Sequence, residues 1–417
     1  MYHRTGRALV VTALVAASAG VALVASSATA APVKGATTAA KPTADRSIFG
    51  RHSLDLRASG SAKAGGLLRA AAAAPAPASP GLPYPYTGTT LTNGVVGPLQ
   101  IAVGPRGRVY VADGFVGVLT RLGDKAPLFQ APKDHSVGGI DVRPDGSYAF
   151  TWGNQPAGKG YLTIRPAKGR SVTVDLGAYE KKYNPDARNN YGAQSTDPCV
   201  IAAFTDPEGP PARYNGLVDT NPYAVASVRG GWVVADAGGN DLLFVSDKGK
   251  ISTLAVLPPV PVVITKEIAA AIKLPDCTVG VTYNFEPVPT DVELGKSNTL
   301  YVTSLAGGPE IPGILPPTGS VWTLTTAGRK LTRLAKGFSL ATNVAVTPTG
   351  RVLVAELGAG RVSLASKGKP VPLFPLPGVA SLEAYGNSLY AGTLADVDED
   401  TGELKAPGSV VRIDLRF

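Results

Sequence analysis

The stretch GPLQIAVGPRGRVYVADG (97–114) holds two apolar runs joined by a turn rich in Gly and Pro, and the chain repeats this pattern. The further copies are GIDVRPDGSYAFTW (139–152), PYAVASVRGGWVVADAGG (222–239), PTDVELGKSNTLYVTS (289–304), ATNVAVTPTGRVLVAELG (341–358) and ASLEAYGNSLYAGT (380–393). Glycine or asparagine in such a turn relieves the positive φ that tight hairpins need. Each copy therefore predicts two antiparallel strands, and such units must stack on one another to bury their apolar faces.

More strands are predicted between the copies. A third strand follows each copy, at 117–122, 160–164, 240–245, 319–324, 360–364 and 408–413. A fourth follows the first five copies, at 125–129, 169–174, 249–254, 330–334 and 369–374. Four-stranded units repeated radially make a β-propeller. The sixth unit lacks a fourth strand, and the unassigned segment TTLTNG (89–94) can supply it. The predicted fold is all-β: a six-bladed propeller over 84–417, closed by its N-terminal strand.

The first 83 residues differ from the rest in composition. Arg4 and Arg7 precede an apolar stretch that ends near Ala28-Thr29-Ala30, which predicts a secretory signal peptide over 1–30. The alternative is an uncleaved membrane anchor, for which the stretch is short. Residues 31–83 are rich in Ala, Pro and basic residues, and they are expected to form a disordered tether or a cleaved propeptide. The sequence thus predicts export, with no transmembrane anchor after cleavage.

The net charge of +9 does not predict a nucleic-acid-binding protein. Residues 1–83 hold nine Lys and Arg against two Asp, so most of the excess lies outside the predicted propeller. A nucleic-acid surface needs clustered cations that displace counterions. We therefore expect a monomer whose partner is a protein or a small molecule.

Three insertions lengthen the regular spacing of the blades. They lie at about 176–220 after blade 2, 256–288 after blade 3 and 305–318 within blade 4. Repeat folds usually place specificity in such insertions. The two cysteines, Cys199 and Cys277, lie in the first two insertions and are expected to form a disulfide in an exported protein. The alternative is two buried free thiols.

Polar residues on the predicted innermost strands raise the possibility of a metal-dependent hydrolase. Alignment of the copies places five oxygen-bearing side chains toward the axis: Asp141, Asp291, Glu293, Asn343 and Glu383. Carboxylate and amide oxygens suit a hard cation such as Ca²⁺, which could activate water. The alternative is a channel lined by polar residues without a ligand.

Other candidates for chemistry are few. Acidic residues end the second strand of three copies (Asp113, Asp236 and Glu356), where a hydrogen bond to a turn is expected. Asn240 and Asp241 could supply ligands, but they fit a hairpin turn equally well. His135 is the only histidine after the predicted tether, and no GxSxG sequence accompanies it. No catalytic residue is predicted.

Several irregular strings resemble the ScyD/ScyE family of secreted propeller proteins, which is common in actinobacteria. They are NPYAVAS (221–227), ADAGGNDLLFV (235–245), LAVLPPVPVVIT (254–265), LPDC (274–277), EPVPTDVELG (286–295) and TSLAGGPEIPG (303–313). The repeat is also similar to NHL-type and sugar-lactonase-type propellers. The family resemblance implies a secreted propeller and brings no established catalytic residue.

The favoured prediction is therefore a secreted binding or scaffolding protein that uses its insertions. The expected binding surface comprises Tyr223, Asp236, Asn240, Asp241, Glu286 and Glu310. The alternative prediction is a hydrolase or lactonase with Ca²⁺ at the propeller axis.

Overall fold

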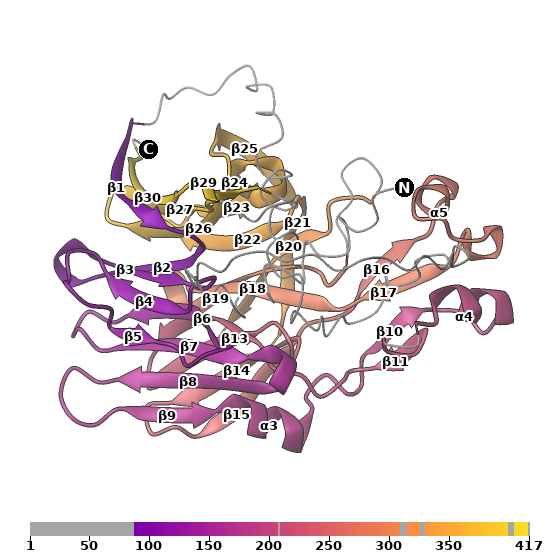
Figure 1. Ribbon diagram of the computed structural model, residues 1–417, viewed down its shortest axis with the longest axis horizontal. Coiled ribbons are helices and arrows are strands. Elements are labelled where there is room, and N and C mark those ends of the chain that lie inside the picture. Colours follow the sequence, from indigo (N-terminus) through magenta and orange to yellow (C-terminus); the bar gives the residue numbers. More distant parts are fainter. Residues whose placement is uncertain (1–86, 207–208, 309–314, 326–329, 399–403, 416–417) are drawn as a thin grey trace, which may run out of the picture.

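The computed structural model describes residues 87–417 except 207–208, 309–314, 326–329, 399–403 and 416–417. Six four-stranded antiparallel sheets make up its main body, and a seventh four-stranded sheet lies beside them (Figure 1). The predicted signal peptide and tether lie outside the described residues. Within the described part of the chain, no helix is long and apolar enough to span a membrane.

The first three blades run from an inner to an outer strand in chain order. Blade 1 consists of β2 (Pro98–Gly104), β3 (Arg108–Asp113), β4 (Val118–Arg121) and β5 (Phe129–Gln130). Blade 2 consists of β6 (Ser136–Val142), β7 (Tyr148–Asn154), β8 (Lys159–Arg165) and β9 (Val172–Asp175). Blade 3 consists of β12 (Pro222–Val228), β13 (Gly231–Asp236), β14 (Asp241–Ser246) and β15 (Ile251–Val256).

The next two blades repeat this order, and the last one draws on both ends of the described chain. Blade 4 consists of β18 (Pro287–Leu294), β19 (Thr299–Ala306), β20 (Gly319–Thr325) and β21 (Thr332–Phe338). Blade 5 consists of β22 (Ala341–Val346), β23 (Val352–Glu356), β24 (Arg361–Ser366) and β25 (Lys369–Pro375). Blade 6 consists of β26 (Val379–Tyr385), β27 (Ser388–Thr393), β30 (Gly408–Asp414) and β1 (Thr87–Val95).

The blades form a ring. Each inner strand contacts the inner strands of both neighbouring blades, and β26 of the last blade contacts β2 of the first. The antiparallel pairing of β1 with β30, from Thr87 opposite Asp414 to Val95 opposite Gly408, places both ends of the described chain in one blade. Ring closure therefore gives every blade a neighbouring blade on both sides, and none of the six lies at an open end of the series.

The turn between the first two strands contains a residue with positive φ in every blade. These residues are Arg106 (64°), Gly146 (85°), Gly230 (79°), Ser297 (56°), Gly350 (89°) and Gly386 (59°). Four of the six are glycines, which adopt this conformation without the steric cost that a β-carbon brings. The glycine-rich centre of each repeat is therefore explained by the hairpin that it forms.

The first two insertions combine into one module, which we call the insertion module (190–215 and 260–285). Its sheet has the order β11 (Arg213–Asn215), β10 (Asn190–Ala193), β17 (Thr282–Phe285) and β16 (Val260–Val263). Helices α4 (Pro198–Phe204) and α5 (Lys266–Ala271) cover it, and a core that includes Phe204, Ile268 and Tyr283 is buried between them. In Figure 1 the module extends outward from the blades.

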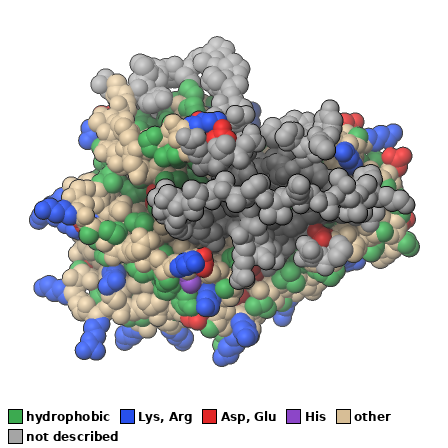
Figure 2. All heavy atoms as spheres, viewed as in Figure 1, with side chains coloured by type: hydrophobic (Ala, Val, Ile, Leu, Met, Phe, Trp, Pro, Cys, Tyr) green, Lys and Arg blue, Asp and Glu red, His purple; other side chains and the backbone are tan. Residues whose placement is uncertain are grey.

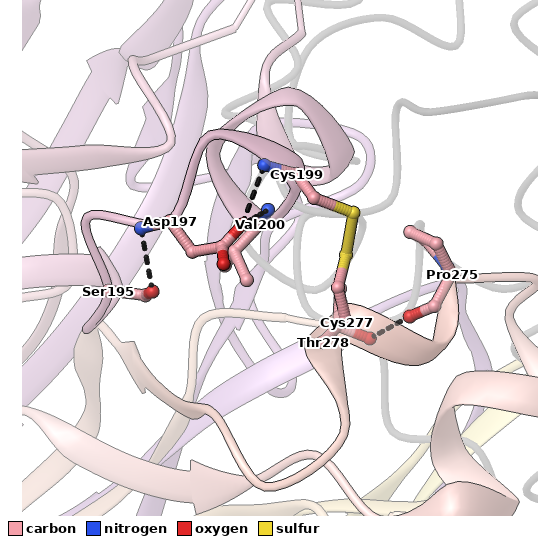
Figure 3. Close-up of a disulfide and its surroundings, with 7 residues drawn as sticks. All are labelled: Ser195, Asp197, Cys199, Val200, Pro275, Cys277 and Thr278. Atoms are coloured by element: carbon pink, nitrogen blue, oxygen red, sulfur yellow. Dashed lines mark hydrogen bonds between the residues drawn. A yellow bond between two sulfur atoms is a disulfide. The ribbon is translucent and has the colours of Figure 1, made fainter.

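The predicted disulfide is present in the insertion module (Figure 3). It joins Cys199 of α4 to Cys277, with 6.3 Å between the Cα atoms. Asp197 accepts hydrogen bonds from the backbone N–H groups of Cys199 (2.7 Å) and Val200 (3.4 Å), and so caps α4. The disulfide therefore ties the two insertions together at the end of the module that bears the helices.

The remaining elements are short. Helix α3 (Leu176–Tyr183) follows β9 and packs beside blades 2 and 3, where the Tyr179 hydroxyl lies 3.0 Å from the Thr253 hydroxyl. A separate two-stranded ribbon of β28 (Asp396–Val397) and β29 (Leu404–Ala406) forms in the chain segment that connects β27 to β30. Five one-turn 3₁₀ helices occupy connections: η1 (Pro105–Gly107), η2 (Gln155–Ala157), η3 (Asp276–Thr278), η4 (Lys296–Asn298) and η5 (Leu357–Ala359).

Candidate functional site

The inner strands bring the predicted axial residues close to one another, and several of their polar atoms are used in hydrogen bonds between blades. Val344 N–H of blade 5 donates to Asp291 of blade 4 at 2.9 Å. Leu382 N–H of blade 6 donates to the Asn343 side-chain oxygen of blade 5 at 2.7 Å. These side chains therefore join neighbouring blades.

Gln100 crosses from blade 1 to the blades on the other side of the ring. Its side-chain amide donates to the Thr290 carbonyl at 3.3 Å and accepts from the Asn343 side chain at 3.0 Å. The Ser381 hydroxyl donates to the Pro98 carbonyl at 2.6 Å, which joins blade 6 to blade 1. At this level the axis is occupied by a hydrogen-bonded network of side chains.

One step further along the inner strands lie three acids. Asp141 accepts from the N–H groups of Val142 and Ser227, both at 2.5 Å, so it too joins two blades. Glu293 and Glu383 share a hydrogen bond with each other. All three are partly accessible to solvent although protein surrounds them, as expected for side chains that face the inside of a narrow channel.

Burial raises the pKa of all the channel acids. It raises the pKa of Asp291 to about 7, despite the hydrogen bond from Val344. Burial also raises the pKa of Glu293 and Glu383 well above the usual value, and the charge of the neighbouring acids adds to the rise. The bond between Glu293 and Glu383 raises the pKa of the first and lowers that of the second.

These contacts fit a structural role better than the predicted metal site. A cation needs free oxygens around one point, whereas Asp141, Asp291 and Asn343 already accept backbone hydrogen bonds. Among the described residues, no three or more His, Cys, Asp or Glu side chains are arranged to hold one metal ion. The channel as it stands supplies one carboxyl pair, Glu293 and Glu383, that is capable of proton transfer.

The predicted binding surface lies largely in the interior. Tyr223 belongs to a buried apolar layer with Leu99 and Leu340, drawn from three different blades. Asp236, Asn240 and Asp241 are at most 1 % exposed, so direct contact with a partner at the surface is excluded for them in this conformation. The hairpin-turn alternative explains their position, because Asp236 and Asp241 face each other across β13 and β14.

The other two predicted surface residues lie in or near the insertions. Glu286 is partly exposed at the end of β17 and accepts a hydrogen bond from the Tyr214 hydroxyl at 3.1 Å. Glu310 lies outside the described residues. The three strand-end acids hold turns, as predicted: Asp113 accepts from the N–H groups of Val96 and Gly97, both at 2.8 Å, and Glu356 from that of Ser339 at 2.9 Å.

The insertions carry the most exposed large apolar side chains of the described residues. Tyr183 and Val218 are 55 % exposed and Val263 is 54 % exposed. Tyr183 ends α3, and its neighbour Asn184 donates to the Gly216 carbonyl at 2.9 Å, close to Val218. These three residues were not predicted, because isolated apolar residues in irregular segments resemble core residues in the sequence.

The insertion module also has a hollow of about 410 Å³. It is lined by Ile201, Thr205, Asp206, Gly209, Pro211, Ala212 and Arg213.

In Figure 2 the Lys and Arg side chains on the visible face are spread around the outline of the molecule rather than gathered in one patch. The absence of nucleic-acid binding stays a prediction.

The fold and the channel place this protein in the class of six-bladed β-propellers. No family model and no curated protein matches the sequence. The ScyD/ScyE resemblance therefore stays a prediction.

The chain is similar to several solved structures. Virginiamycin B lyase from Staphylococcus aureus is 15 % identical with a TM-score of 0.42, covering 80 % of this chain and 99 % of that one. A gluconolactonase from Xanthomonas campestris is 12 % identical with a TM-score of 0.42, covering 79 % and 90 %. Aldose sugar dehydrogenase from Streptomyces coelicolor is 13 % identical with a TM-score of 0.43, covering 80 % and 99 %.

Proposed function

We propose that this chain is an exported, non-enzymatic propeller of the ScyD/ScyE type that recognises a partner protein or a small molecule through its insertions. The observation that carries the proposal is the exposure of Tyr183, Val218 and Val263, which all belong to the first two insertions. Tyrosine is among the residue types that most often dominate the binding energy of protein interfaces.

The construction of the insertion module supports the proposal. Two insertions that are separated by a whole blade share one sheet, one apolar core and one disulfide. A surface that is already ordered loses little conformational entropy on binding. The hollow beside Ile201 and Arg213 has a volume within the range of small-molecule sites.

Site-specific photo-crosslinking tests the proposal. A photoreactive amino acid replaces Val218 or Val263 in the insertions, and Val371, which is 39 % exposed on a blade strand, serves as the control. The proteins are incubated with the producing organism's own cell-envelope and medium fractions. We expect one discrete adduct at Val218 and Val263 and none at Val371. Adducts of equal yield at all three positions, or none at the insertions, would contradict the proposal.

A hydrolase acting at the axis is the second candidate, and the carboxyl pair of Glu293 and Glu383 is the observation that favours it. Such an enzyme would use the pair to transfer a proton during hydrolysis of a lactone. The Glu383→Gln variant distinguishes the candidates. Lactone hydrolysis by the wild type that disappears in this variant would favour the hydrolase over the binding protein.

A further inference from the structure

Four buried acids gather where the first insertion meets blade 3. Glu180 comes from α3, Asp186 from the loop that follows it, Asp236 from the end of β13 and Asp241 from the start of β14. None of them is more than 2 % exposed. The charge of Asp236, Glu180 and Asp186 adds to burial in raising the pKa of Asp241 well above its usual value. The same two causes raise the pKa of Glu180 to about 8.

The four acids differ in how many hydrogen bonds they accept, and Asp241 is the one with both oxygens unpartnered among the described residues. Asp236 accepts from the Thr220 hydroxyl and the Asn221 N–H, both at 2.6 Å, and Asp186 accepts from the Asn240 side chain at 2.8 Å. Neither oxygen of Asp241 has a hydrogen-bond partner among the described residues. The same holds for Glu180 Oε1 and Asn240 Oδ1. Such buried oxygens are costly unless a donor or a cation meets them.

The equivalent positions in the other blades, where the second strand pairs with the third, hold other residue types. Asp236 and Asp241 face each other as the last residue of the second strand and the first of the third. The last pair between the second and third strands is Asp113 and Val118 in blade 1, Asn154 and Lys159 in blade 2, Ser304 and Ser320 in blade 4, Glu356 and Arg361 in blade 5, and Thr393 and Ser409 in blade 6. In blade 5 the Arg361 guanidinium lies 2.8 Å from Glu356. Of these blades, only blade 3 opposes two acids.

We propose that blade 3 binds a divalent cation of the Ca²⁺ type in the place where blade 5 has an arginine. Three oxygens face one side of Gly239: Glu180 Oε2, Asp241 Oδ1 and the Asp219 carbonyl lie 3.3, 3.5 and 3.6 Å from the position that a β-carbon would take. Ca²⁺ binds oxygens at 2.3–2.6 Å. The site would be complete if these oxygens moved by about 1 Å toward an ion that lies away from the Gly239 backbone.

The proposed ligands are two carboxylates, the Asn240 side-chain oxygen and a backbone carbonyl. This set does not require three acids around one point, which the described residues do not provide. Carboxylate, amide and carbonyl oxygens together are the usual ligands of Ca²⁺. Asp186 and Asp236 contribute negative charge and hold the loops, and the missing β-carbon of Gly239 leaves room for the ion.

Calorimetric titration of the metal-free protein with CaCl₂, with MgCl₂ for comparison, tests the site. We expect one Ca²⁺ per chain and a melting temperature that rises with Ca²⁺ and falls with EDTA. Asp241→Asn keeps the shape and removes a charge, so it should weaken Ca²⁺ binding by at least about tenfold. Asp134→Asn, which removes a carboxylate from an exposed loop between blades 1 and 2, should bind Ca²⁺ as the wild type does.

Two results would overturn the proposal. One is the absence of Ca²⁺ binding by the wild type at about 1 mM, the weak end of the range for calcium modules. The other is unchanged affinity in Asp241→Asn. If that variant does not fold, Gly239→Ala places a methyl group among the three oxygens and must abolish binding. The test uses no partner, so its outcome is independent of the proposed binding function.

Discussion

Single polar side chains hold the inner ring of the propeller together. Asn343 is the clearest case, because its amide accepts from Leu382 N–H and donates to Gln100, linking blades 5, 6 and 1. Its side chain is fully buried. A residue that the sequence suggested as a metal ligand is thus explained by the need to pair backbone groups where blades meet.

We expect Asn343→Ala to lower the free energy of unfolding by about 2–4 kcal/mol, because it leaves the buried Leu382 N–H and Gln100 oxygen without partners. Asn387→Ala, at an exposed turn, is the matched control and should cost less than about 0.5 kcal/mol. Urea unfolding of both variants measures the difference. Similar losses of unfolding free energy in the two variants would show that the axial hydrogen bonds do not contribute to stability.

The acids of blade 3 predict how stability depends on pH. The pKa of Glu180 rises from 4.5 to about 8 on folding, so the folded protein binds more protons than the unfolded chain between these values. In EDTA, stability should therefore fall as pH rises from about 5 to 8. Glu180→Gln should reduce this slope, as measured by melting temperature across the range. An unchanged slope in the variant would contradict the assignment to Glu180.

At the scale of elements, the sequence predicted the structures that depend on residues close together in the chain. The hairpin turns follow from Gly and Asn in the repeats. The short helix α5 is capped by Thr265, whose hydroxyl accepts from Ile268 N–H at 3.2 Å. The sheet of the insertion module could not be predicted. Its central pair joins Gly192 to Asn284, which are far apart in the sequence, and neither strand carries a repeat pattern.

The contacts of the candidate site could not be predicted for the same reason, because they join residues that are far apart in the sequence. The copies placed Asp291 and Asn343 at equivalent positions of two inner strands, and the structure has them there. The sequence could not reveal that each would accept a hydrogen bond from a backbone N–H group of the next blade. Asp236 and Asp241 were included in the predicted binding surface, although both also fitted a turn, and both are buried. The first insertion folds over them, which only the tertiary structure reveals.

The disulfide should stabilise the insertion module more than the blades. It joins residues 78 positions apart, and such links typically add about 2–4 kcal/mol. In the double variant Cys199→Ser, Cys277→Ser we expect faster hydrogen exchange within 190–215 and 260–285. Exchange in blades 1 and 6 should not change. Equal acceleration in all blades would show that the module and the ring unfold as one unit.

At the scale of the whole molecule, the ring depends on β1. A protein that begins at Tyr84 keeps β1 and should melt at the temperature of the protein that begins at Ala31. A protein that begins at Gly94 loses most of the strand that pairs with β30, so blade 6 would expose an edge and the melting temperature should fall. Equal melting temperatures for the two shorter proteins would contradict closure by β1.

The measurement that tests the central claim most directly is the dissociation constant of the crosslinked partner for a set of matched variants. Tyr183→Ser and Val263→Ser alter the insertions, Val371→Ser alters an exposed blade position, and Glu383→Gln alters the channel. We predict that the two insertion variants weaken binding by at least about tenfold, as expected for anchor residues. The other two variants should bind as the wild type does. Binding that is lost in Glu383→Gln and kept in the insertion variants would contradict the account.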